Sequence, residues 1–402
     1  MVHILYLAHD LADPAVRRRV LMLRAGGAEV TLAGFRRADN MLAAIEDVVP
    51  IELGRTADGR FGQRIAAVLK ACLSAGGTLR NVRRPDVILA RNLEMLAVAN
   101  RAAGLFAGDV PIVYECLDIH RLLLRKDFAG RALRSVEARL GRNVRLLITS
   151  SPAFVEHYFR PRSAIAAPYM LLENQVLDLG GEATTPPRPR PPAPGEPWKI
   201  GWFGAIRCRK SLAILSAFSR AMQGKVEIVL RGRPAYSEFD DFDAFVRDEP
   251  FLSYHGPYRN PEDLAAIYDE VQFSWAIDFF EEGLNSSWLL PNRLYEGCRY
   301  GAVPIAVKGT ETAKFLASKG VGILLERADT ENLEAAFGAM DQERYLEAFR
   351  LIADLGPEPW TFDRTDCAAL VQRLQVLAGS VQTRAAPALS RHVATKVDYN
   401  EG

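Results

Sequence analysis

The sequence lacks the cysteine pattern of a disulfide-linked or zinc-binding protein. It has only five cysteines in 402 residues. They are an odd number, far apart, with no Cys-x-x-Cys pair. This spacing argues against a disulfide framework and a zinc site, and it is typical of a reducing compartment. The sequence therefore gives no indication of a metal site.

Long apolar runs are also missing. No stretch approaches the roughly 18 apolar residues that a membrane-spanning helix needs. The N-terminus, MVHILYLAHD, has a short apolar run with no basic residues before it. That pattern predicts a first buried strand rather than a signal peptide. These absences predict a cytoplasmic protein, and a contact with a membrane surface stays open.

An excess of charge of either sign is absent. The chain has 50 basic and 49 acidic residues, and the formal net charge is +1. No global field attracts nucleic acid, which we do not expect as a partner, and any anion site must be local. The chain is 49% apolar and 25% charged, which is typical of a globular protein. Its length exceeds what one core accommodates, so we expect two domains.

What the sequence has is a repeated alternation of short apolar runs with longer helical patterns. The runs are apolar throughout, which predicts parallel strands in two doubly wound, Rossmann-like α/β domains. Such sheets bind ligands outside the carboxyl ends of their strands, so we expect the site in a central cleft that both domains face. The expected strands are Val2–Ala8, Glu29–Ala33, Asp86–Ala90, Pro111–Glu115, Arg145–Thr149, Lys199–Phe203, Val226–Arg231, Leu252–Tyr254, Gln272–Ala276, Val303–Val307 and Gly322–Leu325.

A proline-rich stretch divides the two halves. Its residues, GGEATTPPRPRPPAPGEP, cannot form a helix or a central strand and predict a stiff linker. A surface loop inside one domain is the alternative. The expected divisions are an N-terminal domain over 1–178, a linker over 179–198, a C-terminal domain over 199–355, a helical segment over 356–379 that packs back toward the N-terminal domain, and a disordered tail over 380–402.

Cations gather where the strand Lys199–Phe203 is expected to end. The segment GAIRCRKS begins with Gly204 and carries Arg207, Arg209 and Lys210 in front of an expected helix. Free amides at a helix N-terminus, together with cations, suit a phosphate or diphosphate. A tight turn with solvated cations is the alternative, because the spacing matches neither the Walker A nor the dinucleotide motif.

A polar loop follows the expected strand Gln272–Ala276. Residues 278–290 include glycine, asparagine and serine, and a helix is expected to start at Pro291. Arg293 and Glu296 lie on one face of that helix. The carboxylate could accept hydrogen bonds from two ribose hydroxyls, and the loop amides and hydroxyls could hold a phosphate. An ion pair between the two side chains on a solvated helix is the alternative.

These segments together resemble a known family. Residues 283–306, GLNSSWLLPNRLYEGCRYGAVPIA, resemble the nucleotide-binding segment of GT-B glycosyltransferases of the family-4 type, where P-x-(K/R)-x-x-E follows a Gly/Asn-rich loop. The segment DLADPAVRRRVLMLRAGGAEVTLAG resembles that family's N-terminal D-P-R-V-R-R-E-A motif. GWFGAIRCRKS stands in place of its phosphate loop, and LLENQV in place of its N-G-V. The likeness is greatest to bacterial exopolysaccharide transferases, including the succinoglycan type.

The resemblance implies a GT-B fold and a retaining transfer of a sugar from a nucleotide diphosphate-sugar, with no metal and no other cofactor. Glu296 would hold the ribose, while Arg207 and Lys210 would neutralise the leaving diphosphate. The implied donor-binding residues are Gly204, Glu282, Gly283, Asn285, Ser286, Ser287, Asn292, Arg293 and Glu296.

The sequence also departs from the family pattern. The first of the family's two glutamates is missing, since Trp288 stands eight residues before Glu296. Ala205 stands where the family's arginine usually lies, so Arg207 or Arg209 must substitute for it. These departures affect the contacts to the donor sugar more than the contacts to the nucleotide.

Two polar residues follow the strand Pro111–Glu115. Asp118 and His120 stand where the family turns a histidine or an acid toward the sugar and the acceptor. We interpret them, with Arg207 and Lys210, as the catalytic residues. The acid would orient the histidine, or act as a base if the reaction inverts configuration. A structural histidine is the alternative.

The acceptor is expected to be linked to a membrane lipid. His9 and Asp10 follow the first strand and are expected to line the acceptor side. Clustered cations attract anionic lipid by about 1 kcal/mol each near the surface, which would place the protein at the cytoplasmic face of the inner membrane. A solvated arginine-rich helix is the alternative. The clustered residues are Arg80, Arg83, Arg84, Arg121, Arg125, Lys126, Arg131, Arg134, Arg139, Arg142 and Arg145.

We therefore predict an enzyme that moves a hexose, glucose from UDP-glucose, to a lipid-linked oligosaccharide in exopolysaccharide biosynthesis. One alternative is an inactive GT-B-like protein that binds a nucleotide or glycan within an export complex, which the missing glutamate supports. Another is a different GT-B enzyme, such as an inverting glucuronosyltransferase or a sugar epimerase.

Overall fold

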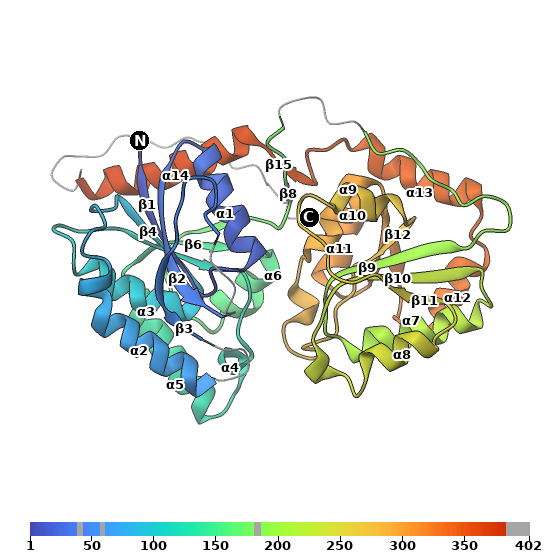
Figure 1. The fold of residues 1–402 in the computed structure, drawn as a ribbon, viewed down its shortest axis with the longest axis horizontal. Helices are drawn as coiled ribbons and strands as arrows, with labels where there is room; N and C mark the ends of the chain where they lie inside the picture. The colour runs from blue at the N-terminus through green and yellow to red at the C-terminus, as the bar shows by residue number, and fades with distance from the viewer. Residues whose placement is uncertain (38–42, 57–60, 181–185, 383–402) are drawn as a thin grey trace.

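The computed structural model describes residues 1–37, 43–56, 61–180 and 186–382. Two parallel sheets lie side by side along the longest dimension of the molecule, each in its own helical covering (Figure 1). The prediction of two doubly wound, parallel α/β units is confirmed.

The N-terminal domain is built on a seven-stranded sheet with the order β3-β2-β1-β4-β5-β6-β7. Its strands are β1 His3–Ala8, β2 Glu29–Arg36, β3 Ile51–Arg55, β4 Val87–Arg91, β5 Ile112–Cys116, β6 Val144–Thr149 and β7 Tyr169–Leu171. Its helices are α1 Pro14–Ala25, α2 Phe61–Thr78, α3 Asn92–Ala103, α4 Arg121–Leu124, α5 Phe128–Gly141, α6 Pro152–Phe154 and the π-helical turn η1 Val155–Phe159. One apolar core lies under α2, α3 and α5, and a second lies under α1 on the opposite face.

The C-terminal domain is built on a six-stranded sheet with the order β11-β10-β9-β12-β13-β14. Its strands are β9 Trp198–Ile206, β10 Val226–Pro234, β11 Leu252–Tyr254, β12 Phe273–Trp275, β13 Val303–Val307 and β14 Ile323–Leu325. Its helices are α7 Arg209–Ala221, α8 Phe242–Asp248, α9 Leu264–Asp269, α10 Asn292–Tyr300, α11 Glu311–Lys319, α12 Thr330–Gly338 and α13 Gln342–Asp354, with short 3-10 turns at Tyr236–Glu238 and Ser286–Trp288.

The chain crosses between the domains twice. After the first domain, β8 (Val176–Leu177) pairs in parallel with β15 (Thr361–Phe362), which follows α13. Helix α14 (Arg364–Gln382) then returns to the N-terminal domain and packs against α1 (Figure 1). The two helices touch closely, because a Cβ atom on Gly26 would lie 2.2 Å from the Cys367 carbonyl oxygen. Helix α14 therefore ties the second domain to the first.

The proline-rich stretch is fastened to the C-terminal domain rather than suspended between the two. Arg190 donates hydrogen bonds to Asp269 Oδ1 at 2.7 Å and to the Tyr300 carbonyl at 2.9 Å. The Gln272 side chain donates to the Arg190 carbonyl at 2.9 Å. Prolines keep this backbone extended while one arginine anchors it.

Some elements differ from the sequence predictions. Strand β3 was not predicted because it is a short edge strand with polar side chains, and α12 and α13 were not predicted either. Residues 380–382, expected in the tail, continue α14, and the rest of the expected tail lies outside the described residues. Within the described ranges, no helix combines the length and apolarity needed to cross a bilayer.

Candidate active site

The cations after β9 face the loop after β12. Arg207 Nη2 lies 3.8 Å from Asp278 Oδ2, and its guanidinium lies 4.5 Å from the centre of the Phe280 ring. Lys210 Nζ donates a 2.6 Å hydrogen bond to Glu282 Oε1. Arg209 instead pairs with Asp240 at 2.9 Å. Of the two candidates for the family's arginine, Arg207 is the one at this loop.

Gly204 leaves the end of β9 open. Its φ of +111° lies in the left-handed region that disfavours a side chain. A Cβ atom there would meet only Tyr258 Oη, at 3.9 Å, among the described residues. A ligand can therefore approach the backbone at the place where the sequence predicts a phosphate.

Arg293 joins the same group from helix α10. Its Nη2 donates to the Ile277 carbonyl at 2.8 Å and lies 3.6 Å from Asp278 Oδ2. Asp278 thus holds two arginines at the carboxyl end of β12. The alternative of a solvated ion pair between Arg293 and Glu296 is wrong, since both side chains are buried and have other partners.

Glu296 accepts hydrogen bonds from Asn260 Nδ2 at 3.0 Å and from Tyr268 Oη at 3.1 Å. Burial raises the pKa of its carboxyl group, and the two hydrogen bonds and the charge of Arg18 counteract the rise. Arg18 lies on α1 of the other domain and donates to Asn174 Oδ1 at 3.0 Å. Glu296 therefore faces the domain boundary, as a ribose-binding carboxylate in an interdomain cleft requires.

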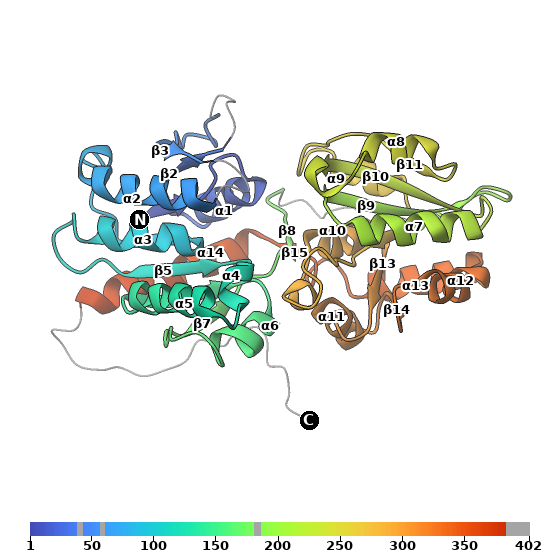
Figure 2. The ribbon, with the colours of Figure 1, turned by 90° about the horizontal axis from the view of Figure 1, so that it is seen from below.

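Asn285 connects the loop after β12 with the end of β5. Its side-chain amide donates to Asp118 Oδ1 at 2.9 Å and to the Ile119 carbonyl at 2.8 Å. In Figure 2, the loop before α10 lies at the edge of the C-terminal domain that faces the N-terminal domain. Desolvation by the surrounding protein raises the pKa of Asp118, and the charge of Arg207 opposes the rise. His120 Nδ1 accepts from the Leu122 amide at 3.3 Å and caps α4, which is the structural role considered for it.

The remaining donor-side candidates differ in position. Ser286 Oγ accepts a 2.8 Å hydrogen bond from the Glu281 amide, so it shapes the loop. Gly283 is exposed, with a φ of +80°, and Asn292 is exposed at the start of α10. Ser287 lines a separate cavity next to Trp288. The two serines, expected to act together on a phosphate, therefore point to different places.

The acceptor-side candidates lie after β1, at the same sheet edge as Asp118. His9 Nε2 lies 3.8 Å from Asp13 Oδ2, and burial, with the charge of Arg91, lowers its pKa to about 3. The ring is therefore neutral at physiological pH. Asp10 Oδ2 lies 3.8 Å from Arg37 Nε.

A buried ionic network supports this edge. Glu115 accepts from Arg19 at 2.6 Å, from Arg91 at 3.2 Å and from Tyr6 Oη at 2.9 Å. It joins β1, β4, β5 and α1 below the candidate residues. Because both arginines and the tyrosine satisfy it, this carboxylate is fixed in its charged form, and its pKa is lowered despite burial.

Several residues of this site were not singled out from the sequence. Asp278 could have been found, because it directly follows a buried strand. Arg18, Asn260 and Tyr268 gave no such signal, since their relation to Glu296 depends on contacts between distant segments. No cluster of three or more metal-ligating side chains occurs in the ranges that the structure describes.

The fold defines the GT-B class of architecture: two Rossmann-like domains, here with cations and carboxylates gathered where their strand ends meet. Within that class, the chain belongs to the family of the succinoglycan biosynthesis protein ExoL of Rhizobium meliloti (strain 1021). It is 66% identical to that protein over 379 residues, which cover 94% of each chain. No family model matches the sequence.

Solved structures agree on the fold. Sucrose-phosphate synthase from Thermosynechococcus elongatus superimposes with a TM-score of 0.65 at 15% identity, covering 96% of this chain and 99% of that one. Anabaena HepE, solved in complex with UDP-glucose, has a TM-score of 0.65 at 16% identity, covering 94% and 100%. At this identity the likeness establishes the GT-B fold alone.

Proposed function

We propose that the chain transfers glucose from UDP-glucose to a lipid-linked oligosaccharide in exopolysaccharide biosynthesis, with retention of configuration and without a metal ion. The observation that carries the proposal is the group formed by Arg207, Asp278 and Arg293 at the strand ends of the second domain, facing Asp118 of the first. The name of the ExoL relative and the UDP-glucose bound to HepE support the pathway and the donor.

The chemistry follows from where the charge develops. When the glycosidic bond to the nucleotide breaks, negative charge grows on the departing diphosphate. Arg207 and Lys210 flank the start of α7 beside the open backbone of Gly204, and fixed cations at that place stabilise the transition state more than the bound donor. Glu296 would accept hydrogen bonds from the ribose and so position the diphosphate against these cations.

The test is release of UDP from UDP-glucose by the purified chain, with membranes carrying lipid-linked intermediates and with a chelator present. Turnover and an α-linked product would support the proposal. An inverted anomer would indicate Asp118 as a general base, which its raised pKa favours. Absence of both UDP binding and UDP release would leave a non-transferring glycan binder.

We also propose that the chain contacts a membrane surface peripherally. The basic cluster alone does not form the contact surface. Several of those cations are engaged within the protein: Arg134 donates to the Leu123 carbonyl at 2.6 Å, and Arg145 Nη2 lies 3.3 Å from Asp109 Oδ2. Five exposed apolar side chains of the N-terminal domain instead form stripes on α2 and α5. They are Ile65, Leu69 and Leu73 on α2, and Phe128 and Val136 on α5.

These stripes suit an anionic membrane. Leu73 is 85% and Phe128 77% exposed, and α2, α3 and α5 cover the same face of the sheet (Figure 2). The exposed cations Lys70, Arg131 and Arg139 lie on the same helices. Apolar side chains that enter the lipid interface, with cations beside them, give the combination that peripheral proteins use.

A further inference from the structure

A cavity opens at the domain boundary, next to the loop that carries Asn285. Its volume is about 530 Å³, within the roughly 300–1,000 Å³ of small-molecule sites. The first domain contributes Ala153, Glu156 and His157, and the second contributes the 3-10 turn at Trp288 and the start of α11. Of the site residues predicted from the sequence, only Ser287 is among its described lining residues.

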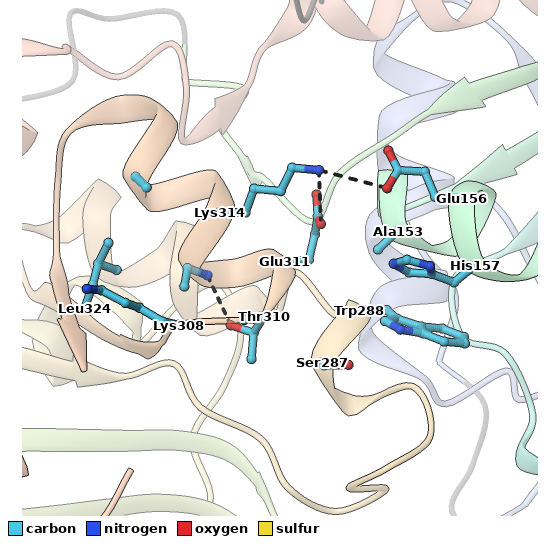
Figure 3. A pocket seen from close by; sticks show the side chains of 13 residues that line it. Ala153, Glu156, His157, Ser287, Trp288, Lys308, Thr310, Glu311, Lys314 and Leu324 are labelled. Atoms are coloured by element: carbon cyan, nitrogen blue, oxygen red, sulfur yellow. Dashed lines mark hydrogen bonds and ion pairs between the residues drawn. The ribbon is translucent and has the colours of Figure 1, made fainter. Parts of the chain in front are cut away.

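An aromatic platform forms one wall. The rings of His157 and Trp288 lie with centroids 5.3 Å apart and planes at 32°, one from each domain (Figure 3). The negative faces of aromatic rings attract the weakly positive C–H groups of a sugar ring, and their flat surfaces match its apolar side. Trp288 stands where the family's first glutamate is missing, so this position has exchanged a charge for a stacking surface.

Charged groups surround the platform without an excess of either sign. Lys314 Nζ lies 3.9 Å from Glu156 Oε2 and 3.9 Å from Glu311 Oε2, and it bridges the two domains (Figure 3). These distances are too long for hydrogen bonds, so a sugar hydroxyl can approach from the side and bridge the two charged groups. Lys308, the other lysine of the cavity, pairs with Glu326. The balance favours a neutral ligand over a phosphate or a nucleotide.

We propose that this cavity binds a neutral hexose unit of the acceptor oligosaccharide, away from the sugar that reacts. The inference rests on the proposed transfer to an oligosaccharide. Trp288 follows Asn285 by three residues, and its carbonyl accepts a 2.5 Å hydrogen bond from Ser151 Oγ of the first domain. A hexose stacked on Trp288 therefore steadies the same loop that holds Asp118, and longer acceptors react better than their terminal sugar alone.

The experiment titrates the full chain with cellobiose, laminaribiose and gentiobiose, three neutral glucose disaccharides, by calorimetry. UDP is titrated separately on the same samples. Trp288→Ala and Lys314→Met are each expected to weaken disaccharide binding about tenfold, the loss of roughly one good contact, and to leave UDP binding unchanged. Trp288→Phe, which keeps a ring, should retain most of the affinity. Lys319→Met, which removes the same charge from the same helix outside the cavity, is the matched control.

The outcomes separate the two proposals. No disaccharide binding by the wild-type chain, or binding that survives both Lys314→Met and Glu156→Gln, overturns the cavity assignment. These two exposed positions decide the matter even if Trp288→Ala folds poorly. In another outcome, the wild-type chain binds disaccharide but no UDP, and disaccharide binding is lost in the variants. That result would support the cavity assignment and contradict the proposed function.

Discussion

The side-chain amide of Asn285 donates a 2.9 Å hydrogen bond to the carboxylate of Asp118 across the domain boundary. The same amide donates to the Ile119 carbonyl, so it is held at two points of the opposite domain. This contact aligns the candidate acid of the first domain with a loop whose other residues contact Arg207 and Lys210. It is a direct hydrogen-bonded link between the two halves of the candidate site.

Replacing Asn285 with aspartate tests this link. Asn285→Asp keeps the shape but places a second carboxylate against Asp118 and the Ile119 carbonyl, which accept and cannot donate. Repulsion should open the domain boundary, so we expect kcat with UDP-glucose to fall about 100-fold while UDP affinity changes less. Steady-state kinetics and UDP calorimetry check this. Asn143→Asp, at an exposed position of the N-terminal domain that directly precedes β6, at the sheet edge opposite to Asp118, should be without effect.

Arg207 and Arg209 form a matched pair for the diphosphate assignment. Arg207 lies at the loop after β12, whereas Arg209 is engaged with Asp240. We expect Arg207→Ala to lower kcat by roughly 10²-fold, the cost of removing one charge-stabilising donor, and Arg209→Ala to leave it nearly unchanged. The double replacement of Arg207 and Lys210 should lower it further. Equal effects of the two single variants would contradict the assignment.

Glu296 is the proposed ribose ligand. Replacing it with glutamine, which has nearly the same shape, tests the role of the carboxylate itself. Glu296→Gln can still accept a hydrogen bond from Tyr268, so the helix should stay in place. Loss of one acceptor for a ribose hydroxyl should weaken UDP binding about tenfold. Glu173→Gln provides the control, because Glu173 also accepts a hydrogen bond from a tyrosine, Tyr295 of α10, at 2.9 Å. Calorimetry on both variants decides whether the effect is specific.

The two sheets were predictable for a physical reason. Strands buried on both faces are apolar throughout, so β1, β4, β9 and β13 stand out in the sequence, while the polar edge strand β3 does not. The site was predictable only in its positions after the strands. The partner of each side chain was not predictable. The pairing of Asn285 with Asp118, for example, depends on how two domains that are far apart in the sequence contact each other.

The same distinction explains the serines. Ser286 and Ser287 are neighbours in a polar loop, and the sequence pattern gave both the same role. The short 3-10 turn that begins at Ser286 rotates successive side chains apart, so one bonds within the loop and the other lines the cavity beside Trp288. Local backbone geometry of this kind has no clear signature in composition or spacing.

The apolar stripe on α2 gives a prediction about membranes. Leu69→Ser combined with Leu73→Ser removes two exposed leucines from one helical face without disturbing the core. We expect sedimentation with vesicles containing anionic lipid to fall at least about tenfold, and turnover on soluble acceptors to stay unchanged. Leu351→Ser with Val376→Ser removes two other exposed apolar side chains, from α13 and α14. If both pairs reduce sedimentation alike, the contact is not specific to α2.

Glu137 allows a test of how burial couples charge to stability. Its Oε2 accepts from Tyr158 Oη at 2.7 Å and from Ser163 Oγ at 2.9 Å, while its Oε1 has no hydrogen-bond partner among the described residues. Burial raises the pKa of the carboxyl group, and the two hydrogen bonds oppose the rise only in part. Between the unfolded pKa of about 4.3 and the raised folded pKa, the native state binds the extra proton.

The sign of the pH dependence follows from that difference. Where the native state binds more protons than the unfolded one, the free energy of unfolding falls as pH rises. The contribution of Glu137 is therefore most favourable below its unfolded pKa and is lost as pH rises through the folded value. Urea unfolding between pH 5 and pH 8 should show this fall in the wild-type chain and a flatter profile in Glu137→Gln, whose amide does not titrate. Parallel profiles for the two proteins would show that this carboxyl group keeps its ordinary pKa in the folded state.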